Sequence, residues 1–507
     1  MKIAISYPPI INSLGQKAMV SQNRNVQYFS VPTYLLAVTH AQAATGLKKD
    51  GHDVYWDDGN AQLKNYQNWL DDLVKFKPDL VVFETTTPIM KFMWKTVNEV
   101  KEKLPNTKIV MTGYHVMRKP IETFENSKTD IIILSNHIDF VLRKLVKKFD
   151  PIISIDAYDQ VLDSICYRNN KNKIHTSISF KKIENVNSSE IIDRDLIQWK
   201  RYAYENGNFL QTPGTYATSV IRDCTFGKCT FCRYNGPELS FSIMDVKKSV
   251  DEYENLIEKY KVKEIFDDSG VWYRGKDAKN FANEIISRNL HKKGCYFGFN
   301  TRFEYLDEEI IKILAKANFR FVLIGLESGS DYTLEKLKKG YTRETVINNL
   351  KLMKKYGLHP HLTIMVGYYW ENEKMLKETV DFVKELMFSG LARTLQVTLC
   401  TPLDYTPYHQ ECIDQKVLLT QEYIDHDMSK LIVKTPIPHE KYYDAVKEMY
   451  FIAFHPKFIL RQILFLFTFR KRDWQFLLTY SYRAIRRVKQ HVFNLTKSSK
   501  LKKNVKT

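Results

Sequence analysis

Cys224-Thr-Phe-Gly-Lys-Cys229-Thr-Phe-Cys232 places three cysteines within nine residues, directly after an apolar run at 216–221 that predicts a β-strand. Three thiolates on one loop can bind three irons of a four-iron cluster and leave the fourth iron without a protein ligand. Gly227 relieves backbone crowding where such a loop wraps a cluster. We therefore expect Cys224, Cys229 and Cys232 to be metal ligands.

Two other interpretations of these cysteines stay open on the residues alone. A structural zinc ion needs four ligands, and no further Cys or His lies within 40 residues of the loop, although Cys295 or His175 could supply a distant one. Alternatively, the three cysteines are buried and inert. The chain has seven cysteines, a sparse and odd-numbered set that does not suit a disulfide scaffold and indicates a reducing compartment.

Around the cysteine loop, residues from about 206 to 420 alternate predicted strands with predicted helices. Six β/α units in series are typical of a partial (β/α)6 barrel, whose active site lies at the carboxyl ends of the strands. The expected strands are 216–221, 264–266, 296–300, 321–325, 362–366 and 395–399.

This region resembles the radical S-adenosylmethionine (SAM) superfamily. The ending Cys-x-Phe-Cys after the first barrel strand is similar to that family, and short motifs after the later strands follow in the family's order. The family usually has three residues between its first two cysteines. This chain has four, Thr225 to Lys228, which is similar to a variant among cobalamin-dependent members. The resemblance implies a [4Fe–4S] cluster with SAM bound at the open iron.

The resemblance also implies SAM contacts from residues that end the barrel strands. It assigns the SAM amino group to Asp267 and Asp268, its carboxylate to Arg302, its ribose or ammonium to Glu327, and its adenine to the backbone at Gly367. On the residues alone, the aspartates also suit a solvated turn or a helix N-cap, Arg302 a surface ion pair, and Glu327 a helix cap.

Residues 1–150 alternate short apolar runs with amphipathic segments. Runs at 2–7, 52–56, 79–83, 108–112 and 130–134 predict a doubly wound, Rossmann-like domain with a parallel sheet. Ligands of such sheets bind beyond the carboxyl ends of the strands. Residues 151–205 are expected to form a connector to the barrel.

The N-terminal region resembles the cobalamin-binding domain that precedes many such barrels. The resemblance implies that cobalamin contacts Pro9, Asp58, Thr85, Thr86, Thr87, Gly113 and His115. The motif Asp-x-His-x-x-Gly, whose histidine binds cobalt in better-known domains, does not occur, so we expect cobalt without a histidine ligand. His115 either touches the corrin or is hydrogen-bonded within its own loop. Alternatively, the domain is an empty Rossmann-like relic, and no Gly-x-Gly-x-x-Gly follows the first strand to bind a dinucleotide.

Together these resemblances imply a cobalamin-dependent radical SAM enzyme. Such an enzyme cleaves SAM to a 5′-deoxyadenosyl radical, takes electrons from a donor such as flavodoxin or ferredoxin, and methylates an unactivated carbon of a small molecule or lipid. Two alternatives stay open. One is a cyclase or oxidase that acts on a porphyrin-like substrate, and the other is a non-enzymatic cobalamin or iron–sulfur sensor.

The charge is concentrated near one end of the chain. The formal net charge is +18, but residues 455–507 carry 14 Lys or Arg and a single acid, Asp473. A chain-wide nucleic-acid surface is therefore not expected. Residues 421–507 predict a helical basic region whose last ten or so residues, 497–507, are disordered. Its apolar, basic helix suits either the surface of an anionic membrane or packing on the barrel.

The expected location is the cytoplasm, with membrane association as a further option. The N-terminal sequence enters strand-like residues at once and has no long apolar segment of a signal peptide. No run approaches the roughly 18 continuous apolar residues that a membrane span needs.

Overall fold

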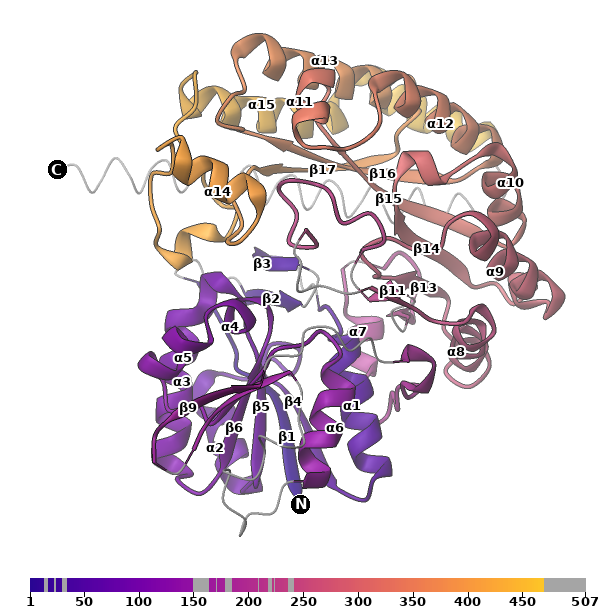
Figure 1. The fold of residues 1–507 in the computed structure, drawn as a ribbon. Helices are drawn as coiled ribbons and strands as arrows, with labels where there is room; N and C mark the ends of the chain where they lie inside the picture. The colour runs from indigo at the N-terminus through magenta and orange to yellow at the C-terminus, as the bar shows by residue number, and fades with distance from the viewer. Residues whose placement is uncertain are drawn as a thin grey trace.

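The computed structural model describes residues 1–12, 17–21, 24–29, 34–148, 164–169, 171–177, 185–207, 209–217, 221–222, 224–235 and 241–468 of the 507-residue chain. Two α/β units lie one on the other. In Figure 1 the N-terminal unit, in indigo and purple, lies below the curved sheet of the second unit, and the strand ends of the lower sheet point toward the upper one.

The first unit is built on a seven-stranded sheet. The first five strands in spatial order are parallel, and the last two are antiparallel. The spatial order is β4 (Asp53–Asp58), β1 (Lys2–Tyr7), β5 (Leu80–Glu84), β6 (Lys108–Thr112), β7 (Ile131–Ile133), β8 (Ile165–Arg168) and β9 (Ile174–Ser177).

Helices cover both faces of this sheet because alternate strand residues point to opposite sides. Ile3 and Ile5 belong to the apolar cluster on the face of the first and last helices, whereas Ala4 belongs to the cluster on the other face. The doubly wound arrangement predicted from the sequence is therefore confirmed. The helices are α1 (Val38–Lys49), α2 (Tyr66–Phe76), α3 (Met90–Lys103), α4 (Tyr114–Arg118), α5 (Pro120–Asn126) and α6 (Ile138–Lys148).

Part of the predicted connector, 151–205, belongs to the N-terminal sheet. Strands β8 and β9 extend that sheet beyond β7, because Cys166 and its neighbours complete the row of backbone hydrogen bonds along β7. A second addition that the sequence did not predict is the antiparallel pair β2 (Lys17–Ser21) and β3 (Arg24–Phe29).

The remaining connector residues fasten the two units together through a buried arginine. Arg194 is fully buried and donates to Thr215 Oγ1 and to the Tyr216 carbonyl, both at 2.9 Å. It also forms an ion pair with Glu252 at 2.8 Å. A buried charge is tolerated only with such partners, so this contact fixes the connector onto the first barrel strand. The helix of the connector is α7 (Lys200–Tyr204).

The second unit is a six-stranded, fully parallel sheet that curves into a partial barrel. Strand order equals chain order, as expected for consecutive β/α units. The strands are β10 (Gly214–Tyr216), β13 (Glu264–Asp267), β14 (Tyr296–Thr301), β15 (Phe319–Glu327), β16 (His359–Val366) and β17 (Thr394–Leu399).

The first barrel strand differs from its predicted bounds, 216–221. The structure ends β10 at Tyr216 and pairs Ile221–Arg222 (β11) with Ser242–Ile243 (β12) in a separate antiparallel ladder. Residues 218–220 lie outside the described residues. The apolar run thus contributes residues to two different sheets. Hydrophobic periodicity alone cannot show where one strand ends and the next begins.

Helices line the outer side of the barrel and continue past it. They are α8 (Val246–Glu258), α9 (Gly275–Ser287), α10 (Glu308–Lys316), α11 (Asp331–Lys336), α12 (Arg343–Tyr356), α13 (Glu373–Phe388), α14 (Pro407–Asp414), α15 (His439–Phe451) and α16 (Pro456–Thr468). Short 3-10 helices are η1 (Thr87–Ile89), η3 (Val186–Ser188), η4 (Leu290–Lys292), η5 (Phe303–Tyr305), η6 (Tyr423–His426) and η7 (Ile452–Phe454).

The described part of the C-terminal region packs on the barrel. Tyr442 of α15 is fully buried, and Arg461 of α16 donates to the Phe388 carbonyl at 2.9 Å. Among the described helices, none combines the length and apolar character required to cross a membrane. The predicted basic end, 469–507, and its expected disorder at 497–507 lie outside the described residues.

Candidate active site

The cysteine loop lies at the carboxyl ends of the barrel strands and is held there by backbone hydrogen bonds. The Thr230 N–H donates to the Leu337 carbonyl at 3.2 Å, and the Tyr408 N–H donates to the Thr230 carbonyl at 2.9 Å. Gly227 has a φ of 57°, in the left-handed region that glycine adopts without strain. Barrel residues on either side therefore fix the shape of the loop.

The three thiols lie in an environment that suits metal-bound thiolates. Burial raises the pKa of Cys224 and raises that of Cys232 to about 12, while backbone N–H groups of the same loop hydrogen-bond to both sulfurs and act in the opposite direction. Arg302 Nη1 donates to Cys229 Sγ at 3.5 Å. N–H donors and a cation around sulfur stabilise its ionised, metal-binding form. The loop therefore fits an iron–sulfur cluster.

The zinc alternative needs four donors that converge on one ion. In the part of the chain that the structure describes, no group of three or more His, Cys, Asp or Glu side chains is arranged to hold a single metal ion. The two distant candidates from the sequence have other partners: Cys295 Sγ faces the Tyr296 carbonyl at 3.7 Å, and His175 Nε2 lies 2.9 Å from Asn169 Nδ2.

Arg302 is only 5% exposed and reaches the cysteine loop rather than the surface. Its guanidinium carbon lies 3.4 Å from the centre of the Phe226 ring. Besides Cys229, it donates to the Lys339 carbonyl and to the Glu304 carboxylate. The surface ion pair that the sequence left open does not describe this buried position.

Glu327 ends β15 beside a buried lysine that sequence reasoning missed. Lys339 Nζ donates to Glu327 Oε1 at 3.1 Å, and both side chains are almost fully buried. Glu327 has a φ of 65°, an unusual conformation for a non-glycine residue that is often found at functional sites. A Cβ at Gly325 would lie 2.0 Å from Glu327 Oε1, so a larger residue there would force the carboxylate to move.

Asp267 ends β13, Asp268 directly follows it, and Asp267 organises the turn after the strand. Asp267 Oδ1 accepts from the Ser269 N–H at 3.0 Å, and Asn300 Nδ2 donates to the Ser269 carbonyl at 2.9 Å. Gly367 directly follows β16 with a φ of 93°, and its N–H donates to Glu371 Oε2 at 2.7 Å. The structure thus joins Cys229, Arg302, Lys339 and Glu327 in one contact chain, and places the two aspartates and Gly367 on neighbouring strand ends.

Several buried polar atoms near these strand ends have no hydrogen-bond partner among the described residues. Such atoms are costly unless a ligand or water satisfies them, so this edge suits a polar cofactor such as SAM. They are Asn300 Oδ1, Thr301 Oγ1, Tyr368 Oη and Thr401 Oγ1.

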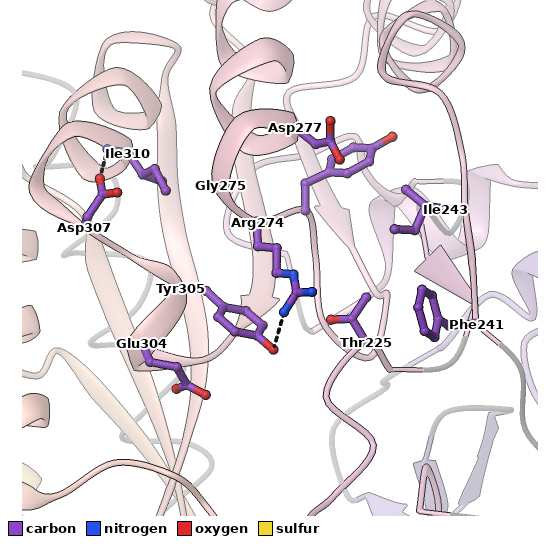
Figure 2. Close-up of a pocket in the computed structure, with 11 residues that line it drawn as sticks. Thr225, Phe241, Ile243, Arg274, Gly275, Asp277, Glu304, Tyr305, Asp307 and Ile310 are labelled. Atoms are coloured by element: carbon purple, nitrogen blue, oxygen red, sulfur yellow. Dashed lines mark hydrogen bonds between the residues drawn. The ribbon is translucent and has the colours of Figure 1, made fainter. Parts of the chain in front are cut away.

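A cavity of about 500 Å³ opens beside the cysteine loop. Figure 2 shows Thr225, which directly follows Cys224, facing Arg274 and Tyr305 across this space. Arg274 Nη1 donates to the Tyr305 hydroxyl at 3.2 Å. The cavity therefore reaches the cysteine loop, where the cluster is predicted.

The carboxyl end of the N-terminal sheet carries the predicted cobalamin residues. Asp58 ends β4 and accepts hydrogen bonds from the Tyr202 hydroxyl and, at 2.9 Å, from the Ala61 N–H. Pro9 follows β1 and packs against Gly59, where a Cβ would lie 2.7 Å from Pro9 Cδ. The Pro9–Gly59 contact packs the loop after β1 against the loop after β4.

Gly113 and the threonines form the centre of this edge. Gly113 has a φ of 112°, and a Cβ there would lie 2.1 Å from the Thr85 carbonyl oxygen. Thr86 Oγ1 is buried and has no hydrogen-bond partner in the described structure. The close approach of Gly113 to the Thr85 backbone brings the two loops together. The unsatisfied Thr86 hydroxyl is a feature that a bound ligand explains, so this edge fits cobalamin.

His115 is held by protein groups. Its Nδ1 lies 3.2 Å from Thr87 Oγ1, and its ring packs edge-on against Tyr423 with centroids 4.8 Å apart. Burial lowers the pKa of His115 to about 3, so the ring is neutral. Both partners come from other segments of the chain, so the predicted hydrogen bond within its own loop is not the one that His115 makes, and a contact with the corrin stays a prediction.

A buried network below this edge was missed by sequence reasoning. The Tyr7 hydroxyl donates to Glu84 Oε2 at 3.0 Å, and His40 Nδ1 lies 3.4 Å from the same oxygen. Burial raises the pKa of Glu84 to about 7, and the nearby charge of Arg233 acts in the opposite direction. Glu84 directly precedes Thr85, Thr86 and Thr87 in the sequence. Its position at the end of a predicted strand could therefore have indicated that it lies at this edge.

The cysteine loop and the cobalamin edge touch each other. Arg233, which directly follows Cys232, lies over the Tyr114 ring at 5.0 Å, and Tyr234 packs edge-on against the same ring. Tyr114 directly follows Gly113. The two predicted cofactor sites are therefore neighbours in space, although more than 100 residues separate them in the chain.

The comparisons with known proteins agree with this geometry. Residues 218–383 match the model of the radical SAM superfamily. The chain is 26% identical over 402 residues to an anaerobic magnesium-protoporphyrin IX monomethyl ester cyclase of Cereibacter sphaeroides, and the match covers 78% of this chain but 62% of the cyclase. It is 25% identical to an uncharacterised methyltransferase of Pyrococcus horikoshii, covering 82% of this chain and 87% of that protein.

A solved structure with the same fold contains two of the implied cofactors. It is the radical SAM methyltransferase TsrM of Kitasatospora setae with cobalamin and a [4Fe–4S] cluster bound. The TM-score is 0.63 at 12% identity, and the match covers 89% of this chain and 88% of TsrM.

The barrel is therefore a radical SAM domain. The chain has the two-domain fold of cobalamin-binding radical SAM enzymes such as TsrM. The radical SAM match of the barrel implies a [4Fe–4S] cluster and SAM.

Proposed function

We propose that this protein is a cobalamin-dependent radical SAM enzyme that methylates an unactivated carbon of a small molecule. The observation that carries this proposal is the contact between the cysteine loop and the cobalamin edge, through Arg233 and Tyr114. A methyl transfer between two cofactors and one substrate requires all of them in a single enclosed space. One relative is named a methyltransferase and another a cyclase, and both names are compatible with radical chemistry on a small molecule.

Each cofactor has residues in this chain that suit it. Cys224, Cys229 and Cys232 would hold the cluster, and Glu327 with its partner Lys339 would bind SAM together with the polar strand ends. Pro9, Asp58, Thr85 to Thr87 and Gly113 would bind cobalamin. When bound, these groups supply a carbon-centred radical from SAM and a transferable methyl group on cobalt.

The protein's own contribution is positioning and exclusion of water. Buried side chains beside the cysteine loop, including Tyr368 and Tyr408, form an apolar cluster, and the partly buried Phe231 of the loop packs against it. An apolar wall protects a reactive radical from side reactions. Lys339 and Glu327 form a buried ion pair, so both charged groups are already held in place before the substrate enters.

The product distinguishes the proposal from its strongest alternative. The cyclase relative supports a reading in which the same cofactors close a ring or oxidise a porphyrin-like substrate. Mass spectrometry of cell extracts with and without the protein tests this directly. A metabolite that gains one CH₂ unit supports methylation, whereas a loss of hydrogen at constant carbon number supports cyclisation. A sensor would form neither product and no 5′-deoxyadenosine.

The partners and location follow from the same proposal. We propose a flavodoxin or ferredoxin as electron donor, a cytoplasmic location and no nucleic-acid partner. The cavity at Thr225 and Arg274 gives the donor an approach to the cluster from outside the barrel.

We further propose a peripheral membrane contact through α16. Its aliphatic residues Ile459, Leu460, Ile463 and Leu464 are 44–57% exposed and recur at helical spacing on one side. The chain that follows carries Arg470, Lys471 and Arg472. Exposed apolar residues beside basic ones suit an anionic membrane, and a lipid-soluble substrate would then be close to the enzyme.

Leu460→Glu with Leu464→Glu is expected to weaken binding to phosphatidylserine vesicles roughly tenfold or more, because two exposed leucines that would insert into the lipid are replaced by anionic side chains. Vesicle co-sedimentation measures this, with phosphatidylcholine vesicles as the neutral comparison. Leu419→Glu changes an equally exposed leucine outside α16 and should bind like the wild type. Wild-type sedimentation of the double variant would rule out the contact.

A further inference from the structure

The contact between Arg302 and Cys229 assigns the arginine a role that the family resemblance does not give it. The resemblance places Arg302 on the SAM carboxylate. In the structure, Nη1 donates to Cys229 Sγ at 3.5 Å, and the guanidinium carbon lies 3.4 Å from the centre of the Phe226 ring. Phe226 and Cys229 both belong to the cysteine loop, so Arg302 holds this loop from two sides.

The guanidinium makes two further hydrogen bonds. Nη2 donates to the Lys339 carbonyl, and Nε donates to the Glu304 carboxylate. Three of the five N–H groups therefore have a protein acceptor, and these bonds hold the guanidinium beside the cysteine loop. The neighbouring cation Lys339 donates to Glu327 Oε1 at 3.1 Å and lies 5.4 Å from the centre of the Tyr341 ring, so a second positive charge stands beside the guanidinium.

We propose that Arg302 is a positioning residue that sets the reduction potential of the cluster through the sulfur of Cys229. This inference rests on the proposed cluster at Cys224, Cys229 and Cys232. Hydrogen bonds to the sulfurs and nearby charge are main determinants of the potential of an iron–sulfur cluster.

The direction of the effect follows from charge. Reduction adds one negative charge to the cluster, and the positive guanidinium stabilises that charge more strongly because Arg302 is buried. The hydrogen bond to sulfur acts in the same direction. Arg302 therefore raises the potential and makes the cluster easier to reduce, which is the first requirement of SAM cleavage.

The test is an anaerobic redox titration of the full-length protein without SAM, followed by EPR. Arg302→Gln should make reduction at least tenfold less favourable, a shift of about 59 mV to more negative potential for a one-electron couple. Arg302→Lys keeps the positive charge but loses the planar set of guanidinium N–H donors and the contact with the Phe226 ring. The reduction potential of this variant should therefore shift less than that of Arg302→Gln. Iron and sulfide content, measured first, confirms that the cluster is present.

Arg274→Gln is the matched control. It removes the same charge from the loop before α9, where Arg274 is exposed and lies over the Tyr305 ring at 5.2 Å (Figure 2). Its potential should equal that of the wild type. An equal shift in Arg274→Gln and Arg302→Gln would mean that net charge alone acts, and would overturn the assignment to the Cys229 contact.

The remaining outcomes are also decisive. If Arg302 held the SAM carboxylate, Arg302→Lys would weaken the SAM-induced change of the EPR spectrum while the potential without SAM stayed unchanged. Loss of the cluster in both variants would assign Arg302 to loop assembly and would contradict a tuning role. Absence of a cluster from the wild type would instead defeat the proposed function, so the two failures are distinguishable.

Discussion

Cys229→Ala is expected to abolish the iron–sulfur absorption of the anaerobically purified protein and to reduce SAM cleavage to background. The cysteine supplies one of three thiolates, and two thiolates do not hold a four-iron cluster with a single open iron. The fold should persist because the loop is held by the backbone bonds of Thr230. Visible absorption, circular dichroism and 5′-deoxyadenosine formation measure the three effects.

Cys295→Ala is the control for this experiment. Cys295 is fully buried in the barrel and was the distant zinc ligand that the sequence left open. If the loop binds a cluster, Cys295→Ala keeps both absorption and SAM cleavage. If Cys295→Ala lost its bound metal while Cys229→Ala retained it, the assignment of the metal site to the cysteine loop would be wrong.

Gly113→Val is expected to remove bound corrin while the cluster stays at wild-type content. Its Cβ would lie 2.1 Å from the Thr85 carbonyl oxygen, and the φ of 112° is unfavourable for valine. Reconstitution with hydroxocobalamin and corrin absorption measure the loss. Gly51→Val has a similar positive φ, 89°, but open space around the new side chain, and should retain near-stoichiometric corrin.

Thr86→Val separates a loss of corrin contact from a loss of folding. The Thr86 hydroxyl is buried without a hydrogen-bond partner in the described structure, so removing it should raise the thermal stability of the corrin-free protein. The same change should weaken corrin binding, because the ligand loses a hydrogen bond. Weaker corrin binding together with lower stability would show that Thr86 acts on the fold, not on cobalamin.

The elements that repeat a local pattern were predictable. Strand β1 has its predicted bounds, Lys2–Tyr7, and the five parallel strands of the N-terminal sheet carry the expected apolar runs. Pairings between distant segments were not predictable. Strands β8 and β9 join this sheet through backbone bonds to β7, and a single sequence contains no signal of which edge accepts a strand.

The candidate site shows the same division. The three cysteines could be predicted as ligands because they are close in sequence and share one chemistry. Lys339 and Arg233 were missed because their importance comes from partners on other elements, Glu327 and Tyr114. Arg302 was found for its position at a strand end, but its contact with Cys229 required the folded loop.

EPR spectroscopy of the dithionite-reduced, anaerobically purified protein, recorded before and after SAM is added, tests the central claim most directly. The claim is that three cysteines leave one iron of a cluster open for SAM. The account predicts a [4Fe–4S]⁺ signal that changes shape when SAM binds. Stoichiometric zinc with four protein donors, and no EPR signal in either sample, would contradict it.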